Sequence, residues 1–117
     1  MDAKTKYKAK KIKAVFFDID DTLRIKASGY MPASITYVFE QLKAKGIMTG
    51  IASGRAIYGV VPEIRALNPD VFVTINGARV LDKKGEVLYK KPIPREITQK
   101  YVAWAKSVGI EYGFAGK

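Results

Sequence analysis

Nearly continuous apolar runs mark three short segments of the chain. They cover residues 12–17, 47–52 and 71–75, and each is followed by charged or turn-forming residues. A short run that is apolar at consecutive positions, rather than at alternate ones, is typical of a strand buried on both faces. We therefore predict three buried strands.

Apolar residues at helical spacing follow the first two of these strands. Residues 33–46 place them at i, i+3, i+4 and i+7, between the start signal Ser34 and the stop signal Gly46. Residues 55–67 show similar spacing, but Pro62 interrupts it, so we expect a kink or two short helices there. The apolar positions are Ile35, Val38, Phe39 and Leu42 in the first helix, and Ile57, Val60, Val61 and Ile64 in the second segment.

The remaining segments predict a loop, a hairpin and a final helix. Residues 24–32 are polar and rich in turn formers, and residues 78–91 contain two strand-like runs around Lys84-Gly85. Residues 94–108 have helical spacing and end at Gly109. On one side of this helix lie Ile97, Tyr101, Trp104 and Val108, and we expect the two aromatic residues to pack in a core rather than to stack on a ligand.

The alternation of strands and helices predicts an α/β fold with a parallel sheet. Right-handed crossovers bring the ends of all three strands to the same edge. Ligands of such sheets bind beyond the carboxyl ends of the strands. Polar clusters follow the three strands at residues 18–22, at Ser53-Gly54 and at Asn76-Gly77. We expect these clusters to converge on one site.

Charge and composition limit the classes of protein to which this chain can belong. The chain has 117 residues and a net charge of +10, but its first thirteen residues hold six lysines and one acid. We interpret residues 1–11 as a solvated basic lead-in, because the other basic residues form no stripe interleaved with aromatics of the kind that binds nucleic acid. There is no cysteine, which favours a reducing, cytoplasmic location. No apolar run is long enough to span a membrane.

Two of the aspartates after the first strand suggest catalysis. In an extended backbone Asp18 and Asp20 point the same way, with Asp21 turned aside. Two close carboxylates repel, so one has a raised pKa unless a cation intervenes. One would then serve as nucleophile or metal ligand and the other as general acid and base, and Mg²⁺ prefers such oxygen ligands. Turn and N-cap aspartates are the alternative, but a cap needs one aspartate.

These residues resemble motifs of the haloacid dehalogenase superfamily. "FFDIDDTL" is similar to its first motif, D-x-D-x-T after an apolar strand, and "GIASGR" resembles its second motif. The order of the motifs, with "INGARVLDKKGEVLYKKPI" after the third strand, looks most like the Cof-type sugar-phosphate phosphatases. The resemblance covers residues 12–110 and implies a Rossmann-like, three-layer parallel sheet. Because dehalogenases lack the second aspartate, Asp20 favours phosphoryl transfer over cleavage of a carbon–halogen bond.

The resemblance implies a role for each matching residue. Asp18 would attack phosphorus and become an aspartyl-phosphate, and Asp20 would protonate the leaving oxygen and then activate water. Mg²⁺ would be held by the Asp18 carboxylate and the Asp20 backbone carbonyl. Phosphate oxygens would be held by the Ser53 hydroxyl and by the backbone N–H groups of Ile19 and Gly54, the latter at the start of a helix whose N-terminus favours an anion. Thr22 would fix the aspartate loop.

Three further positions have less definite roles. Arg55 would either contact substrate or be a surface charge, and Asn76 would either contact substrate or serve the turn with Gly77. Asp21 stands where many members of the superfamily have glycine, a variant that also occurs in the Cof-type branch.

Two parts of the family pattern have no counterpart in this sequence. They are a lysine that steadies the nucleophile and a later acidic cluster that completes the metal site. We expect residues 12–80 to form the N-terminal part of the core and residues 81–117 a hairpin and the beginning of a cap domain, with the C-terminal half of the core absent. The first strand would then be an exposed apolar edge. We therefore expect the chain to be the N-terminal part of a longer protein.

The function expected from these residues is Mg²⁺-dependent hydrolysis of a small phosphorylated metabolite, without nucleic-acid or membrane partners. The alternative is a non-catalytic phosphate-binding or interaction module with the same fold. A receiver-like signalling domain fits less well, because no aspartate ends the third strand. A dinucleotide-binding protein fits less well too, because "GIASGR" lacks G-x-G-x-x-G.

Overall fold

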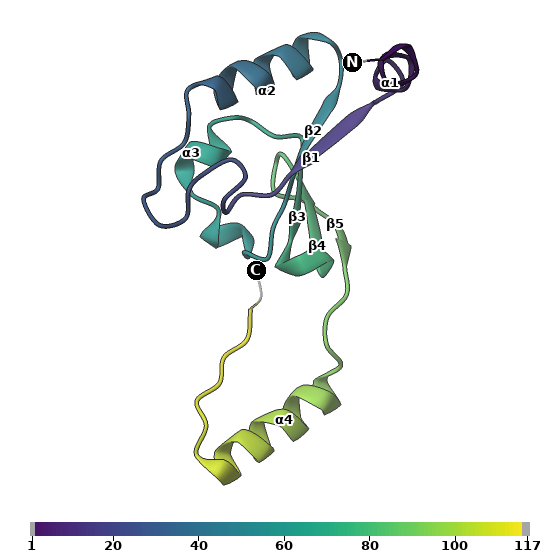
Figure 1. Ribbon diagram of the computed structural model, residues 1–117. Helices are drawn as coiled ribbons and strands as arrows, with labels where there is room; N and C mark the ends of the chain where they lie inside the picture. Colours follow the sequence, from purple (N-terminus) through teal and green to yellow (C-terminus); the bar gives the residue numbers. More distant parts are fainter. Residues whose placement is uncertain (1, 116–117) are drawn as a thin grey trace.

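The first three strands of the sheet are parallel and lie side by side in chain order (Figure 1). The computed structural model describes residues 2–115, whose five strands follow the spatial order β1-β2-β3-β4-β5. Phe17 of β1 is in register with Ile51 of β2, which is in register with Phe72 of β3. The strands are β1 (Ala14–Phe17), β2 (Met48–Ala52), β3 (Val71–Thr74), β4 (Arg79–Asp82) and β5 (Val87–Lys90). The predicted α/β class and the parallel arrangement of these three strands are confirmed.

The predicted hairpin extends this sheet. β4 pairs antiparallel with β3, where Thr74 is opposite Arg79, and β5 pairs antiparallel with β4. Gly85 makes the tight turn with a φ of 86°, a region that glycine enters without steric cost. The sheet is therefore mixed, and the hairpin continues the sheet of the core. The division into a core and a cap at residue 81 stays a prediction.

The helices between the parallel strands follow the expected pattern. α2 spans Ser34–Ala44. The segment with Pro62 forms two short pieces, a 3₁₀ turn η1 (Ile57–Gly59) and the helix α3 (Pro62–Arg65). Val61 is extended, with ψ of 152°, because a residue before proline avoids the helical region, and Pro62 starts the next helix, where its missing N–H costs nothing.

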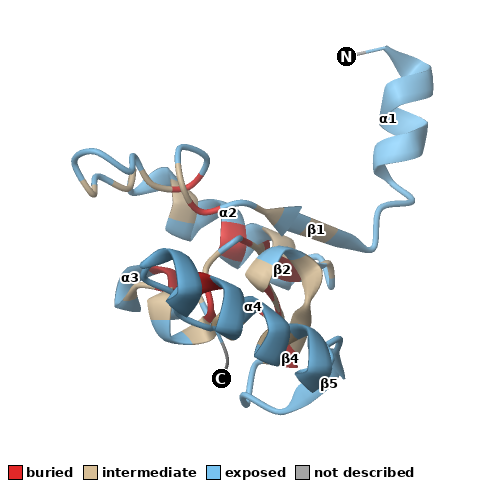
Figure 2. Cartoon of the chain, turned by 90° about the horizontal axis from the view of Figure 1, so that it is seen from below, coloured by how far each residue is buried: buried red, intermediate tan, exposed pale blue. Residues whose placement is uncertain are grey.

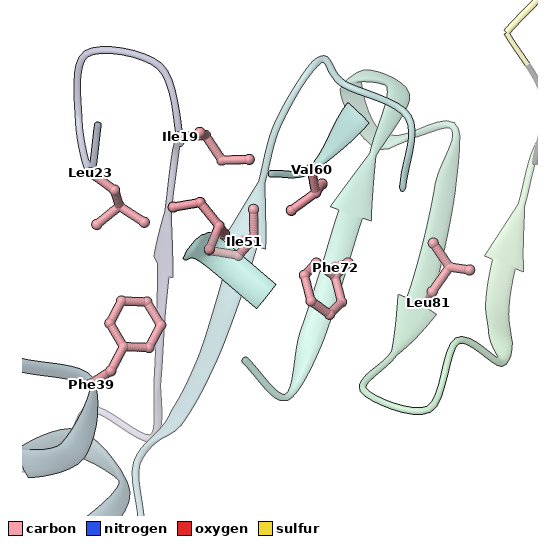
Figure 3. Close-up of a cluster of buried hydrophobic side chains, with 8 residues drawn as sticks. Ile19, Leu23, Phe39, Ile51, Val60, Phe72 and Leu81 are labelled. Atoms are coloured by element: carbon pink, nitrogen blue, oxygen red, sulfur yellow. The ribbon is translucent and has the colours of Figure 1, made fainter. Parts of the chain in front are cut away.

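The hydrophobic core lies on one face of the sheet (Figure 3). Ile51, Phe72 and Leu81 come from three adjoining strands and point to the same face. α2 contributes Phe39, whose ring lies 5.0 Å from that of Phe17, and α3 contributes Ile64. The buried cluster consists of Ile19, Leu23, Phe39, Ile51, Val60, Ile64, Phe72 and Leu81. Both helices therefore cover one face.

The opposite face of the sheet is open among residues 2–115. Phe16 is 50% exposed and lies over Gly50, where a Cβ atom would stand 2.3 Å from the phenyl ring. In the described part of the chain β1 is an edge strand, because it pairs with β2 alone. The described residues thus form two of the three expected layers.

The N-terminal helix projects from this body (Figures 1 and 2), and so does the C-terminal segment (Figure 1). The basic lead-in is helical: α1 spans Ala3–Ala9, buries no residue, and is capped by Asp2, whose carboxylate accepts the Thr5 N–H at 2.7 Å. β1 starts at Ala14, two residues later than predicted. None of the helices in the described part is long and apolar enough to cross a membrane.

The final helix, α4 (Arg95–Val108), ends as predicted at Gly109, which has a φ of 71°. The expectation that its aromatic residues belong to a core is wrong for residues 2–115. Tyr101 and Trp104 are 46% and 52% exposed, and their rings contact each other at 5.9 Å. The reason is tertiary, because α4 lies apart from the sheet (Figure 1) and so offers these side chains no partner surface.

Candidate functional site

Backbone hydrogen bonds join the loops that follow β2 and β3. The Ser53 N–H donates to the Val73 carbonyl at 2.9 Å, and the Asn76 N–H donates to the Ser53 carbonyl at 3.1 Å. The Ile75 N–H donates to the Arg55 carbonyl at 3.1 Å. These bonds hold two of the three polar clusters in one rigid arrangement at the carboxyl edge of the sheet.

An open cleft of about 480 Å³ lies at this edge. Asp18 comes from the end of β1, while Ser53 and Gly54 follow β2 and Asn76 follows β3. The residues lining the cleft are Asp18, Ala52, Ser53, Gly54, Val73, Asn76 and Gly77. The structure therefore brings together side chains from all three predicted clusters, as parallel strands require.

Asp18 is exposed to the cleft and is held by its own chain. Its carboxylate accepts the N–H of Ile19 at 2.8 Å. Ile19 is fully buried in the core, so the backbone beside Asp18 has a firm anchor. The same bond occupies the Ile19 N–H, which the sequence predicted as a phosphate donor; that role stays a prediction and requires this bond to open.

Asp20 faces a cation instead of the cleft. Arg55 donates from Nε to one carboxylate oxygen at 3.0 Å and from Nη2 to the other at 2.7 Å, while its Nη1 donates to the Gly59 carbonyl at 2.8 Å. This bidentate contact with Arg55 lowers the pKa of Asp20 from its ordinary value. The expected repulsion between carboxylates therefore raises no pKa at Asp20, because Arg55 is the intervening cation.

Asp21 makes two hydrogen bonds that help to hold the aspartate loop. Its φ of 60° lies in the left-handed region, which glycine prefers and aspartate tolerates, and this explains why either residue suits the position. Its carboxylate accepts the Lys26 N–H at 3.0 Å, and its N–H donates to the Arg24 carbonyl at 2.7 Å. Thr22 is exposed and adds a bond from its N–H to the Ile19 carbonyl at 3.3 Å.

Ser53 and Gly54 shape the other wall of the cleft. The buried Ser53 hydroxyl accepts the Arg55 N–H at 3.0 Å. A Cβ atom at Gly54 would stand 3.0 Å from the amide oxygen of Asn76, so glycine allows this side chain to pack close. Asn76 itself has a φ of 52° and forms the turn as well as lining the cleft.

The helix that was predicted to start at Gly54-Arg55 is absent. Ala56 is extended, with ψ of 162°, and the first helical residues are the three of η1. A single 3₁₀ turn of three residues that starts two residues later is too short to supply the helix N-terminus that was expected beside the phosphate. Ser53 and Gly54 thus stay the phosphate-binding candidates on this wall, and Asn76 stays a candidate substrate contact.

The described residues offer a partial set of metal ligands. Within residues 2–115 no group of three or more acidic, histidine or cysteine side chains is placed to hold a metal ion. The Asp18 carboxylate, an exposed hard oxygen donor beside the cleft, suits Mg²⁺, whereas Arg55 occupies both carboxylate oxygens of Asp20. The predicted ligand set used the backbone carbonyl of Asp20 and not its side chain, and this set stays a prediction.

Comparison with known proteins supports the family predicted from the motifs. A family model described as haloacid dehalogenase-like hydrolase matches residues 15–117. A Streptococcus pyogenes protein, whose name describes a bifunctional phosphatase and peptidyl-prolyl cis-trans isomerase, is 58% identical over the whole chain, which spans 25% of its length.

Two solved phosphatase structures share the fold. One is BT1666 from Bacteroides thetaiotaomicron, with a TM-score of 0.75 and 28% identity, where the match covers 84% of this chain and 36% of that protein. The other is the subclass IIB sugar phosphatase BT4131, with a TM-score of 0.69 and 35% identity, where the match covers 83% of this chain and 38% of that protein. The chain thus spans a quarter to two-fifths of the length of these relatives, and it belongs to the haloacid dehalogenase-like hydrolase family.

Proposed function

We propose that the full-length protein is a Mg²⁺-dependent phosphatase of small phosphorylated metabolites such as sugar phosphates. The observation that carries this proposal is the position of Asp18 on a cleft lined by Ser53, Gly54 and Asn76 at the carboxyl edge of the sheet. A relative named as a phosphatase and a structural neighbour named as a sugar phosphatase support the reaction and the substrate class.

The reaction would proceed in two displacements at phosphorus. Asp20, which the contact with Arg55 holds in its ionised form, first releases one oxygen from Arg55 and takes a proton from water. A carboxylate oxygen of Asp18 then attacks phosphorus, the bond to the ester oxygen breaks, and Asp20 gives this proton to the leaving oxygen. Water then attacks the aspartyl-phosphate, Asp20 takes the proton, and phosphate and the Asp18 carboxylate are released. Both oxygens of Asp20 contact Arg55, so proton transfer requires at least one of these contacts to open.

Bound Mg²⁺ would shield the phosphate from the charge of its nucleophile. The Asp18 carboxylate and the Asp20 backbone carbonyl would hold it in this chain. Ser53 Oγ and the Gly54 N–H would bind phosphate oxygens in the cleft, with Asn76 beside them. Removing divalent cations with a chelator should abolish phosphate release, and added Mg²⁺ should restore it.

The first test is the variant Asp18→Asn in the full-length protein. An amide is a poor nucleophile, so phosphate release from hexose phosphates should fall below detection while the circular dichroism spectrum and the unfolding temperature stay unchanged. Asp82→Asn is the matched control, because Asp82 lies on β4 and, among the described residues, its carboxylate accepts only backbone N–H groups of its own hairpin. Undiminished turnover by Asp18→Asn contradicts the nucleophile assignment.

A non-catalytic phosphate-binding module is the second candidate, favoured by the engagement of both Asp20 oxygens with Arg55. Such a module would bind inorganic phosphate in the same cleft and release none from esters, with wild type and Asp18→Asn alike in turnover. The cytoplasmic location expected from the absence of cysteine belongs to the same proposal.

A further inference from the structure

We infer that Arg55 is a positioning residue that acts on the reaction through Asp20 and not through contact with the substrate. The sequence left Arg55 as a substrate contact or a surface charge, and the structure favours neither. Its guanidinium makes the two hydrogen bonds to Asp20 and one to the Gly59 carbonyl. Three nitrogens of the side chain are therefore bound to protein atoms, and Arg55 is not among the residues that line the cleft.

Arg55 is also the point at which three loops meet. Its side chain reaches the loop after β1 at Asp20. Its N–H donates to Ser53 Oγ in the loop after β2, and its carbonyl accepts the N–H of Ile75 after β3. A displacement of Asp20 relative to the cleft would have to break a bond to this one residue. Arg55 thus sets where the Asp20 carboxylate stands relative to Ser53 and Asn76.

The form of the contact suits arginine specifically. A planar guanidinium matches a carboxylate with two parallel N–H bonds, while lysine provides a point charge on a flexible stem. Side chains of Arg55 and Asp20 are 26% and 27% exposed, so the pair is partly shielded from water. The pair holds the carboxylate in one orientation from which release of a single oxygen makes it available for proton transfer.

Because Asp20 acts in the phosphatase reaction proposed above, this role of Arg55 depends on that function. The decisive experiment is a double-mutant cycle of turnover in the full-length protein with Asp20→Asn, Arg55→Gln and the double variant. Hexose phosphate is the substrate and Mg²⁺ is saturating. Arg55→Gln should lower kcat about 100-fold, at the lower end of what proton transfer contributes, with KM within about threefold of wild type. In the Asp20→Asn background it should lower kcat by less than about twofold, because residues that act as a unit are not additive.

Arg55→Lys should recover part of the lost kcat, since it keeps the charge but loses the two parallel bonds. Arg65→Gln is the control. Arg65 donates to the carbonyls of Val60 and Ile57 on the same segment but contacts no carboxylate among residues 2–115, so its loss reports on the general stability of the segment. Its kcat should stay near that of wild type.

Each other outcome has a distinct meaning. Losses that multiply in the double variant, or a raised KM in Arg55→Gln, overturn the inference and indicate substrate contact. Equal losses in Arg55→Gln and Arg65→Gln overturn it in favour of a structural role. A wild-type protein that hydrolyses no phosphate ester refutes the proposed function and, with it, this role of Arg55. An active wild type with additive losses refutes the role of Arg55 alone.

Discussion

Three aspartates follow β1 within four residues, and each has a different polar partner. Asp18 accepts the N–H of Ile19, Asp20 accepts two bonds from Arg55, and Asp21 accepts the N–H of Lys26. Each partner contributes a positive charge or a backbone dipole, which offsets the repulsion between the carboxylates. These specific contacts therefore stabilise the neighbouring carboxylates, and Asp18 remains at the cleft.

The pair of Asp20 and Arg55 should make stability depend on pH. The hydrogen bond from Arg55 lowers the pKa of Asp20 in the folded chain, so the pair stabilises the fold above the unfolded pKa of about 3.9 and loses this contribution as pH falls through the lowered pKa. Below about pH 4, wild type should lose more free energy of unfolding than Asp20→Asn, by about 0.2–1 kcal/mol for a partly exposed pair. Urea unfolding at stepwise lower pH measures this, and parallel curves for the two proteins would contradict it.

A substitution at Gly54 would test how closely the wall of the cleft is packed. In Gly54→Ala the new Cβ stands about 3.0 Å from the Asn76 amide oxygen and should push that side chain aside. Phosphate binding in the full-length protein should weaken, with a higher KM for hexose phosphate and an unchanged unfolding temperature. Gly113→Ala is the control, because a Cβ atom there meets nothing within 4 Å. Equal KM values in the two variants would show that Asn76 has room to move.

At the scale of elements, α2 is attached to the sheet mainly by one aromatic side chain. Phe39 is 4% exposed and is the one buried residue of α2, and its ring packs against that of Phe17. Helices of this length are marginal in isolation, so their stability comes from the packed face. The attachment of α2 therefore depends on Phe39, with support from half-buried Ile35 and Leu42.

Phe39→Ala should lower the free energy of unfolding by about 3–5 kcal/mol, because it removes a large buried ring and leaves a cavity. For a domain whose total stability is typically about 5–15 kcal/mol, this is a large fraction. Phe39→Leu keeps most of the apolar volume and should cost much less. Denaturant unfolding followed by circular dichroism compares the three proteins. Equal midpoints for Phe39→Ala and wild type would show that α2 is held by other contacts.

At the scale of the whole molecule, the described residues form an elongated body in which helices cover one face of the sheet. Its principal extents are 59 × 30 × 30 Å, since α1 and α4 project from the sheet (Figure 1). Among residues 2–115, helices cover one face, and the edge strand β1 carries the exposed Phe16 on the other. An exposed apolar edge strand pairs readily with another copy.

Residues 1–117 expressed alone should therefore self-associate as concentration rises. Phe16→Lys places a charge on the open face of β1 and should shift the protein towards monomer, as light scattering after gel filtration would show. Tyr58→Lys is the control, because Tyr58 is 70% exposed but lies outside the sheet. A wild-type chain that stays monomeric at all concentrations would contradict the prediction.

The helices and strands could be predicted from the sequence because the residue patterns that indicate them are local. The apolar run at residues 47–52 predicted the place of β2, although helices cover one face of the sheet among residues 2–115, and packing on one face produces the spacing of Ile35, Phe39 and Leu42 in α2. The limits of β1 were wrong by two residues, because pairing with β2 and not apolar character decides where a strand starts. The missing helix at Arg55 has a similar tertiary cause, since the backbone N–H of Arg55 donates to Ser53 Oγ and its carbonyl accepts the N–H of Ile75, which lies after β3.

The sequence by itself determined the α/β class, the parallel arrangement of the first three strands and the convergence of Asp18, Ser53 and Asn76, because chain connectivity places polar residues after successive parallel strands at one edge. Only the tertiary structure decided that Asp20 pairs with Arg55, 35 residues away, and that Tyr101 and Trp104 stay exposed. Such contacts depend on distances between segments that are remote in the chain, and no local pattern of residues encodes those distances.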